Sequence, residues 1–545
     1  MDAPQPRFPA GNAFFNYQLF GGLRPGGSVS FLTRDNWGYA VSAFLSGYVY
    51  AAVTYILLRI PDDELGLNDS TSLKNVLALQ WTAVLFVGII SDSWAPGGLR
   101  RKPYMLLGWI LSSMLWLALF LLFWFVKDRP DEATFTLIIV AFLSLIVATN
   151  ALDIRVIEFS QQEDLNQRGR LLGSYEILRI SGQVAMHVLI LIFGEPDSKS
   201  LLIHLPFPVE YMFLHLAIVC ALPLYGLLQN AEEEKGNGSE PFKMNPFDGF
   251  YSSRDQLSAL RPMSPIFSGR SASPTTVLAP RTSTRFKATY RSFWQSAKQK
   301  VIWQLMAFYC LLFFFSLFEF PGVRQAIQVW ASETAASRVR RNCFSDIAFV
   351  LMIAIWRRYV VNSNWRILTG TVLIFTSFVF AATSSLVVFD VVRDPWITTV
   401  AYVLRAPLRV LTLIAAFVPA IEVAHYGAEG TTFALLGTFQ NLVKLLAAEC
   451  VSQIEQHISA LQFPHDVVVK SEPSTQMRAI FGVLGMSIAF MIPVLGLLLL
   501  PRQKLDAQQL RVYGGYSSLP RAILAFGFLL SFPGVMYLQI SRLDE

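Results

Sequence analysis

The sequence contains few charged residues: Asp, Glu, Lys and Arg make up only 15% of its 545 residues, against 53% hydrophobic residues. A soluble chain of this length needs more charge to cover its surface, so the composition indicates an integral membrane protein. Cysteines number only four and lack metal-ligand spacing. This scarcity excludes a disulfide-rich secreted scaffold, and we expect no zinc or redox site.

Motifs of ATP-driven pumps and of enzymes are also missing. The chain has no Walker sequence, no nucleophile elbow and no glycine-rich phosphate loop, so we expect neither class of protein and no cofactor. The net charge of +6 comes from Lys and Arg in loops between hydrophobic segments. Membrane topology and anionic lipid explain this excess better than a nucleic-acid partner.

Hydrophobic runs long enough to cross a bilayer as helices are plentiful. Because they are uninterrupted and separated by short polar turns, they predict helices rather than barrel strands. We predict twelve spans, at 38–58, 74–91, 103–126, 133–152, 171–193, 210–229, 301–319, 342–360, 367–389, 395–421, 430–450 and 479–500. Lys and Arg after spans 2, 4 and 8 predict cytoplasmic loops and cytoplasmic termini, although the connection after span 7 is also rich in Arg.

The segment 231–300, rich in Ser, Pro and Arg, predicts a mostly disordered cytoplasmic linker. It separates a predicted six-helix bundle at 38–230 from a second one at 301–503. We expect a cytoplasmic segment at 1–37 before the first bundle. The tail at 504–545 contains an apolar stretch at 522–540, which predicts an interfacial helix or an extra membrane span.

A weak internal repeat relates the two halves. The sequence LLGSYEILRI at 171–180 recurs as LLGTFQNLVK at 435–444, and each copy begins 13 residues after a glutamate, Glu158 and Glu422. Together with the layout of six spans, linker and six spans, the repeat favours the all-α major facilitator fold. In that fold two bundles related by a parallel repeat rock about a site at the membrane midplane.

Ionisable side chains inside membrane helices are costly and mark cavities or ion pairs. Arg405 and Arg409 stand four residues apart in span 10, so they share one helical face. Either the two guanidiniums receive a substrate carboxylate in forked geometry, or carboxylates neutralise them, such as Asp153, Asp346 or Glu319.

Further charged candidates lie in other spans. Glu176 and Arg179, three residues apart in span 5, either form an intrahelical pair or contact the substrate. Asp153 and Asp346 are candidates for carrying a coupling proton, because a buried carboxyl group holds a proton more readily; Asp153 could equally pair with a loop arginine. For His187, a single imidazole in an apolar span, we expect a packing role.

A specific resemblance lies in GIISDSWAPGGLRRKPY at 88–104. This loop resembles the motif that joins helices 2 and 3 in the folate-biopterin transporter family of the major facilitator superfamily. Gly88 would permit close helix packing, and Asp92 would receive an arginine or cap a helix N-terminus. Arg100 and Arg101 would hold the loop against acidic partners, so that the motif acts as a cytoplasmic gate latch.

Two further stretches are similar to that family. LDIRVIEFSQ at 152–161 carries Asp153 and Glu158 at the acidic positions, and GAEGTTFALLGTFQNL at 427–442 carries Glu429 at the start of helix 11. The resemblance implies a secondary active transporter in which protons drive the symport of folate, biopterin or a related pterin. Some relatives carry other metabolites, such as S-adenosylmethionine.

The residues alone favour only an organic, anionic solute, carried across the plasma membrane or an organelle membrane. Two alternatives therefore stay open. One is a major facilitator carrier of another solute, such as an amino acid or a nucleoside, and the other is a nutrient receptor that binds without carrying.

Overall fold

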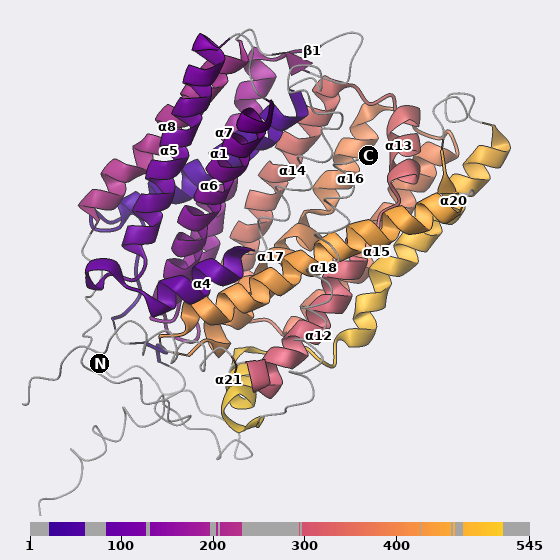
Figure 1. The fold of residues 1–545 in the computed structure, drawn as a ribbon. Coiled ribbons are helices and arrows are strands. Elements are labelled where there is room, and N and C mark those ends of the chain that lie inside the picture. The colour runs from indigo at the N-terminus through magenta and orange to yellow at the C-terminus, as the bar shows by residue number, and fades with distance from the viewer. Residues whose placement is uncertain are drawn as a thin grey trace, which may run out of the picture.

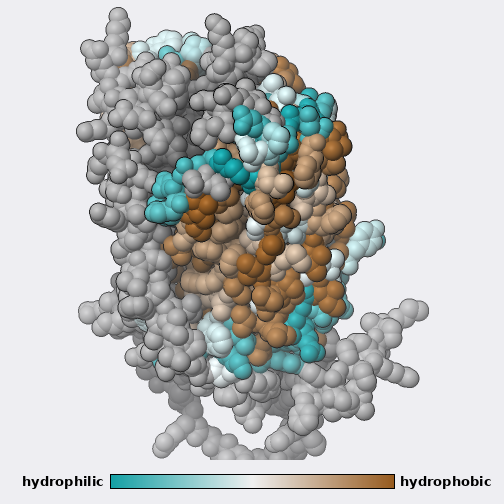
Figure 2. Space-filling model, turned by 90° about the vertical axis from the view of Figure 1, so that its right-hand side faces the viewer, coloured by the Kyte–Doolittle hydropathy of each residue, from teal (hydrophilic) through white to brown (hydrophobic). Residues whose placement is uncertain are grey.

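The structure is a computed structural model that describes residues 21–24, 26–59, 83–126, 131–196, 203–204, 208–230, 294, 297–425, 427–458, 461–463 and 472–515. Among these residues, eight helices are long and apolar enough to cross a membrane. On the face shown in Figure 2, hydrophobic side chains form a band between two hydrophilic ends, as on a helical bundle surrounded by lipid. The chain is an all-α, multi-pass membrane protein, as predicted.

The first half of the chain forms one bundle. Its helices are α1 (Trp37–Arg59), α4 (Val84–Ser93), α5 (Lys102–Phe125), α6 (Asp131–Ser160), α7 (Arg170–Phe193) and α8 (Val209–Gln229). Helix α5 packs against α6 and α8, and α1 packs against α7 and α8. Two glycines bring the backbones of α1 and α7 together, because a Cβ atom at Gly47 or Gly182 would overlap the carbonyl oxygen of Arg179 or Phe44. A short antiparallel pair, β1 (Glu195–Pro196) and β2 (Ile203–His204), lies between α7 and α8.

The second half forms a second bundle beside the first (Figure 1). Its helices are α12 (Lys300–Phe315), α13 (Pro321–Trp330), α14 (Ala335–Ile355), α15 (Trp365–Val388), α16 (Pro395–Leu404), α17 (Ala406–Val423), α18 (Glu429–His457), α20 (Pro473–Met491) and α21 (Lys504–Tyr513). Helix α14 packs against α16 and α17, α15 against α20, and α12 against α18. The short α21 packs against α12 and α17.

The bundles join mainly through two helix pairs: α7 packs against α14, and α4 packs against α18. Small residues allow the second contact. A Cβ atom at Gly88 of α4 would lie 2.4 Å from Ala434 Cβ and 2.5 Å from the carbonyl oxygen of Gly430, both on α18. Gly88 therefore permits the close packing that the motif predicts, and it does so between the two bundles.

Each of the twelve predicted spans overlaps a described helix, but several limits differ. The helix of span 7 ends early, at Phe315, and a further helix, α13, begins at Pro321, beyond the predicted span. Helix α14 begins at Ala335, seven residues before the prediction, because Thr334 and Ser337 form a capping box there. Span 10 is divided at Arg405 into α16 and α17.

The early start of α14 accounts for the unexpected arginines after span 7. Arg338, Arg340 and Arg341 lie in the first turns of α14 instead of a loop. Arg341 forms a buried ion pair with Glu333, and the Arg340 guanidinium lies over the ring of Trp396. Of the predicted linker at 231–300 only its last residues are described, and the apolar stretch at 522–540 and residues 1–20 lie outside the described residues.

Candidate functional site

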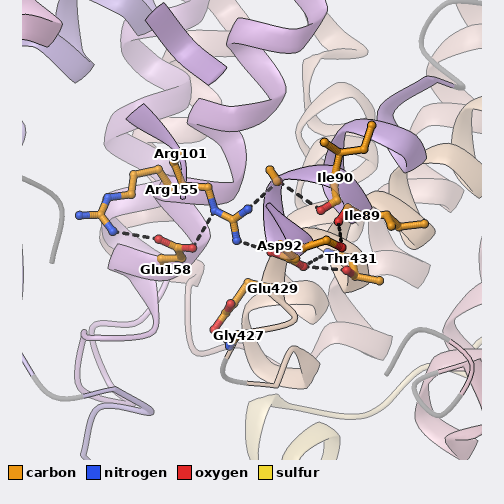
Figure 3. Close-up of polar contacts among 12 residues, drawn as sticks. Ile89, Ile90, Asp92, Arg101, Arg155, Glu158, Gly427, Glu429 and Thr431 are labelled. Atoms are coloured by element: carbon orange, nitrogen blue, oxygen red, sulfur yellow. Dashed lines mark hydrogen bonds and ion pairs between the residues drawn. The ribbon is translucent and has the colours of Figure 1, made fainter. Parts of the chain in front are cut away.

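Asp92 is the centre of a buried polar cluster where α4 meets α18 (Figure 3). Its Oδ1 accepts a hydrogen bond of 2.5 Å from Arg101 Nη2, and its Oδ2 accepts hydrogen bonds from Thr431 N at 2.6 Å and Thr431 Oγ1 at 2.7 Å. Asp92 therefore receives an arginine from its own bundle and caps the N-terminus of α18 in the other bundle. A carboxylate is favourable at that position because it faces the positive end of the helix dipole.

Arg101 joins this carboxylate to a second one. Its Nε donates to Glu158 Oε1 at 2.9 Å, and its Nη1 donates to Ser91 Oγ at 2.6 Å. Burial would lower the pKa of Arg101, but Asp92 and Glu158 outweigh it and hold the pKa above its ordinary value. We call Asp92, Arg101, Glu158 and Thr431 the α4–α18 latch.

The family-motif acids surround this latch. Glu158 also accepts a hydrogen bond of 2.9 Å from Arg155, and Glu429 pairs with Arg24, which precedes α1. Arg24 thus adds an ion pair between the bundles to the hydrogen bonds between Asp92 and Thr431. Arg100 is half-buried and forms no ion pair with any described residue.

Glu422, at the end of α17, belongs to a second polar cluster between the bundles. Its Oε2 accepts hydrogen bonds from Arg168 Nη1 at 2.8 Å and from Gln508 Nε2 at 2.6 Å. Arg168 lies in the loop between α6 and α7, whereas Gln508 lies on α21. The cluster therefore connects the loop of the first bundle to two helices of the second.

Lys504 of α21 strengthens the same connection. Its ammonium donates to the carbonyl oxygens of Leu165 at 3.2 Å and Arg168 at 2.6 Å, and to Asn362 Oδ1 at 2.9 Å. Burial lowers the pKa of Lys504 to about 8. In the same loop, burial raises the pKa of Glu163 to about 7, although the backbone N–H groups of Gly169 and Leu171 donate to this carboxyl and oppose the shift.

His425, between α17 and α18, completes the second cluster. Its ring nitrogens contact Gln299 Nε2 at 2.6 Å and Arg511 Nη2 at 3.0 Å. Burial and the neighbouring Arg511 lower the pKa of His425 to about 3, so the ring is neutral at physiological pH.

A third group of charged residues lies along the α7–α14 contact. On the side of the first bundle, Asp153 Oδ1 accepts hydrogen bonds from Tyr175 Oη at 2.5 Å and Arg179 Nη1 at 3.5 Å. Glu176 Oε1 lies 3.9 Å from the same Arg179 nitrogen. Glu176 and Arg179 thus form a long intrahelical pair, and Asp153 shares the arginine.

On the side of the second bundle, Asp346 of α14 binds two cationic or ionisable groups. Its Oδ1 lies 2.7 Å from Arg409 Nη2, and its Oδ2 lies 3.0 Å from Nδ1 of His187 on α7. Arg409 also donates to Ser345 Oγ at 2.8 Å. The expectation of a packing role for His187 is therefore wrong, because its imidazole bridges to a carboxylate of the other bundle.

Tyr50 of α1 connects the two sides, because both Arg179 and Arg409 interact electrostatically with its hydroxyl group. We call this set the interbundle polar centre; it consists of Tyr50, Asp153, Tyr175, Glu176, Arg179, His187, Asp346 and Arg409. Of its two arginines, Arg409 has the more exposed side chain, with 37% of its surface exposed against 17% for Arg179.

Arg405 lies apart from this centre. It stands at the break between α16 and α17, forms an ion pair with Glu319, and lies over the rings of Phe380, Tyr402 and Phe490. These residues, Phe490 excepted, line a pocket of about 50 Å³ within the second bundle. Arg405 and Arg409 therefore have different carboxylate partners and do not form one fork.

Several residues of these clusters were not singled out in the sequence. Tyr50, Thr431, Arg168 and Lys504 carry no local motif, and their partners lie far away along the chain. Thr431 lies in the first turn of predicted span 11, where backbone N–H groups need a capping acceptor. This position could have indicated Thr431 as a partner for an acidic loop residue. We see no comparable signal for Lys504.

Comparison with known proteins found no family model and no curated protein that matches the chain. Among solved structures, it is similar to the major facilitator superfamily proton:xylose symporter XylE bound to 6-bromo-6-deoxy-D-glucose, with a TM-score of 0.49 and 12% identity over 84% of this chain and 94% of that chain. It is also similar to the human organic anion transporter MFSD10 (TETRAN), with a TM-score of 0.47 and 13% identity over 85% of this chain and 99% of that chain.

Proposed function

We propose that this chain is a secondary active transporter of the major facilitator type that carries an organic anion by alternating access of its two bundles. The observation that carries the proposal is the interbundle polar centre. Charged groups inside a membrane protein are costly, so they are retained where they bind ions or substrates. Here they come from both bundles and meet along the contact that would open and close.

The anion would bind between Arg179 of the first bundle and Arg409 of the second. Each guanidinium is already held by a carboxylate, Asp153 or Asp346. A substrate carboxylate could take the place of one of these partners, and a displaced Asp346 would keep its contact with His187. Arg409 is the better candidate for this exchange because its side chain is more exposed.

Within this class we propose folate, biopterin or a related pterin as the substrate. The support is the sequence resemblance in the loop at 88–104 and in the acidic stretches around Glu158 and Glu429. A folate combines a flat ring with a glutamate tail, and Tyr50 beside two arginines offers an aromatic surface next to cations.

The two latches fit a cycle in which one end of the transporter opens and closes. The α4–α18 latch joins the bundles through the buried hydrogen bonds from Thr431 to Asp92, and the Glu422 cluster joins them through the buried ion pair of Arg168 with Glu422. Both would have to break before a substrate could leave between the bundles at this end, which we assign to the cytoplasm. The coupling ion would be the proton, held by a carboxyl group of the polar centre.

Uptake of labelled folate into a transport-deficient host, at acid and neutral pH, tests the proposal. We expect acid-stimulated accumulation that unlabelled folate competes away and that Arg409→Gln abolishes. Arg393→Gln is the matched control, because Arg393 pairs with the largely exposed Asp390 outside the polar centre. Surface expression of each variant has to equal that of the wild type.

Other outcomes of the same assay separate the alternatives. Accumulation of S-adenosylmethionine, an amino acid or a nucleoside, with no accumulation of folate or pterin, would retain the carrier and replace the substrate. Saturable binding without accumulation of any solute would indicate a receptor and contradict transport.

A further inference from the structure

Glu176 is a buried carboxyl group without a hydrogen bond from any described residue. Its relative exposure is 0%, and neither Oε1 nor Oε2 has a hydrogen-bond partner. The cation of its ion pair, Arg179 Nη1, is 3.9 Å away, beyond hydrogen-bonding distance. An ionised carboxylate in such surroundings lacks the donors that normally offset the loss of hydration.

The side of α7 that carries Glu176 faces the second bundle. Gly173, Glu176 and His187 fall within about 60° of one another around the helix axis. A Cβ atom at Gly173 would lie 3.0 Å from Arg357 Cβ, at the end of α14, and His187 contacts Asp346 of α14. Gly182, on the other side of α7, packs against α1. Glu176 therefore lies at the contact between α7 and α14.

Around Glu176, the first bundle has two buried carboxyl groups but only one cation to pair with them. Arg179 is the cation shared by Asp153 and Glu176. Asp153 holds the two hydrogen bonds, from Tyr175 and Arg179, and so it is the better-stabilised anion. On the second bundle, Asp346 already has Arg409 and His187.

The other titratable groups nearby do not supply a further cation to Glu176. Arg179 and Asp153 are the two that act on it electrostatically. The helices around it carry, among other titratable and charged groups, those of the polar centre and one arginine beside Gly173: Tyr50 on α1, Asp153 on α6, Tyr175, Arg179 and His187 on α7, Asp346 on α14, Arg357 in the π-helical end of α14 (Trp356–Val360) and Arg409 on α17.

We propose that Glu176, rather than Asp153 or Asp346, carries the coupling proton. While α7 and α14 are packed together, the carboxyl group is protonated and neutral, which avoids a buried charge without donors. When the bundles separate, water reaches Glu176, the O–H bond breaks, the proton passes to water and Arg179 stabilises the resulting carboxylate. Proton release thus requires movement of the bundles, which is the coupling that a symporter needs. This inference rests on the proposed transport function.

The protonation state can be tested without a substrate. In infrared spectra of the purified full chain at mildly acidic pH, we expect a C=O stretching band of protonated carboxylic acids that loses intensity in Glu176→Gln. Glu163, whose pKa is raised to about 7, also contributes to this band, and the Glu163→Gln spectrum identifies its share. Glu449→Gln is the matched control, because Glu449 is another buried acid of a membrane helix and accepts a hydrogen bond from Gln453. A band of unchanged intensity in Glu176→Gln, or no such band in the wild type, would overturn the proposal.

The coupling can be tested in proteoliposomes that contain the purified chain. Glutamine resembles the protonated carboxyl group, so Glu176→Gln should exchange labelled folate across the membrane at zero pH gradient but lose accumulation driven by an inward proton gradient. Glu176→Asp keeps an ionisable group and should recover part of the accumulation that Glu176→Gln loses, whereas Glu449→Gln should retain both activities. Accumulation by Glu176→Gln equal to the wild type would show that another group carries the proton.

Failure of this inference and failure of the proposed function give different results. If the wild type moves neither folate nor pterin, nor any other solute, transport is contradicted, while the infrared band still decides whether Glu176 is protonated. If the wild type transports and Glu176→Gln accumulates solute as well as the wild type does, the proposed function stands and the assignment of the proton to Glu176 is wrong. Should Glu176→Gln fail to fold, Glu176→Asp supplies the comparison, since its band should persist with a changed pH dependence.

Discussion

Asp92 and Thr431 are 339 residues apart in the chain, yet the carboxylate of Asp92 accepts both the backbone N–H and the hydroxyl of Thr431. Arg101 holds the other carboxylate oxygen. The loop that resembles a family motif therefore contacts the opposite bundle through a helix N-terminus and not through a second loop. A single carboxylate therefore has partners in both bundles at this end of the molecule.

Asp92→Asn should weaken the α4–α18 latch. A charge-assisted hydrogen bond contributes about 1.5 to 3 kcal/mol, so its loss should raise the open population about tenfold or more. The measurement is the rate at which a thiol reagent labels Ala434→Cys, a buried position beside Gly88, in a background without the four native cysteines. Asp390→Asn, at a largely exposed ion pair, is the control. Equal labelling rates with and without Asp92→Asn would contradict the latch.

Gly88→Ala should destabilise the closed arrangement. The added methyl group would lie 2.4 Å from Ala434 Cβ and 2.5 Å from the Gly430 carbonyl oxygen, and overpacking of this kind costs about 1 to 3 kcal/mol. We expect a lower thermal unfolding temperature in detergent. Gly437→Ala on the neighbouring helix α18 is the control, because no atom lies within 4 Å of its new Cβ. A Gly88→Ala protein as stable as the control would show that α4 and α18 separate easily.

Arg405→Gln should destabilise the second bundle, because the half-buried Glu319 loses its nearer cation and keeps only Arg324, at 3.9 Å. Removing one partner of a buried ion pair costs up to about 3 to 5 kcal/mol, whereas removing both charges costs much less. The double variant Arg405→Gln, Glu319→Gln should therefore recover most of the unfolding temperature lost in the single variant. If the double variant is stable and still transports, Arg405 is a structural partner of Glu319. A stable double variant that has lost transport would instead place Arg405 at the substrate.

Glu163 should make the folded state less stable as the pH rises from about 4.5 to about 7. Burial raises its pKa to about 7 in the folded chain, so the folded state holds a proton that the unfolded state has released. The stabilisation by this group is greatest below the unfolded pKa and is lost as the pH approaches 7, by about 2 to 3 kcal/mol. His425, whose pKa burial lowers to about 3, contributes in the opposite direction over this range. In the profile of unfolding temperature against pH, Glu163→Gln should therefore gain stability relative to the wild type as the pH rises. Glu472→Gln, before α20, should leave the profile unchanged.

Much of the fold could be predicted from the sequence, because long apolar runs indicate membrane helices whatever their partners are. The predicted limits of the helices were wrong where charged residues lie inside a helix. Because of Arg338 and Arg341, we predicted a loop at the start of α14. A capping box begins the helix there, and Glu333 pairs with Arg341. Hydrophobicity alone cannot detect such compensation.

The site was harder to predict, because its ion pairs join distant parts of the chain. The i, i+3 spacing of Glu176 and Arg179 indicated a pair within one helix, and the structure contains it. The i, i+4 spacing of Arg405 and Arg409 suggested a shared partner, but each guanidinium has its own carboxylate. Nothing near His187 in the sequence indicated Asp346, since only the packing of α7 on α14 brings them together.

The short helix α21 has a mechanical consequence. Lys504 binds carbonyl oxygens of the α6–α7 loop and the side chain of Asn362 at the same time, so it staples a corner of one bundle to the other. Two rigid bodies that are stapled at one corner cannot slide past each other there. While Lys504 keeps these contacts, the bodies can only pivot, and the end of the molecule far from α21 moves most. Opening of the end near α21 first requires these contacts to break.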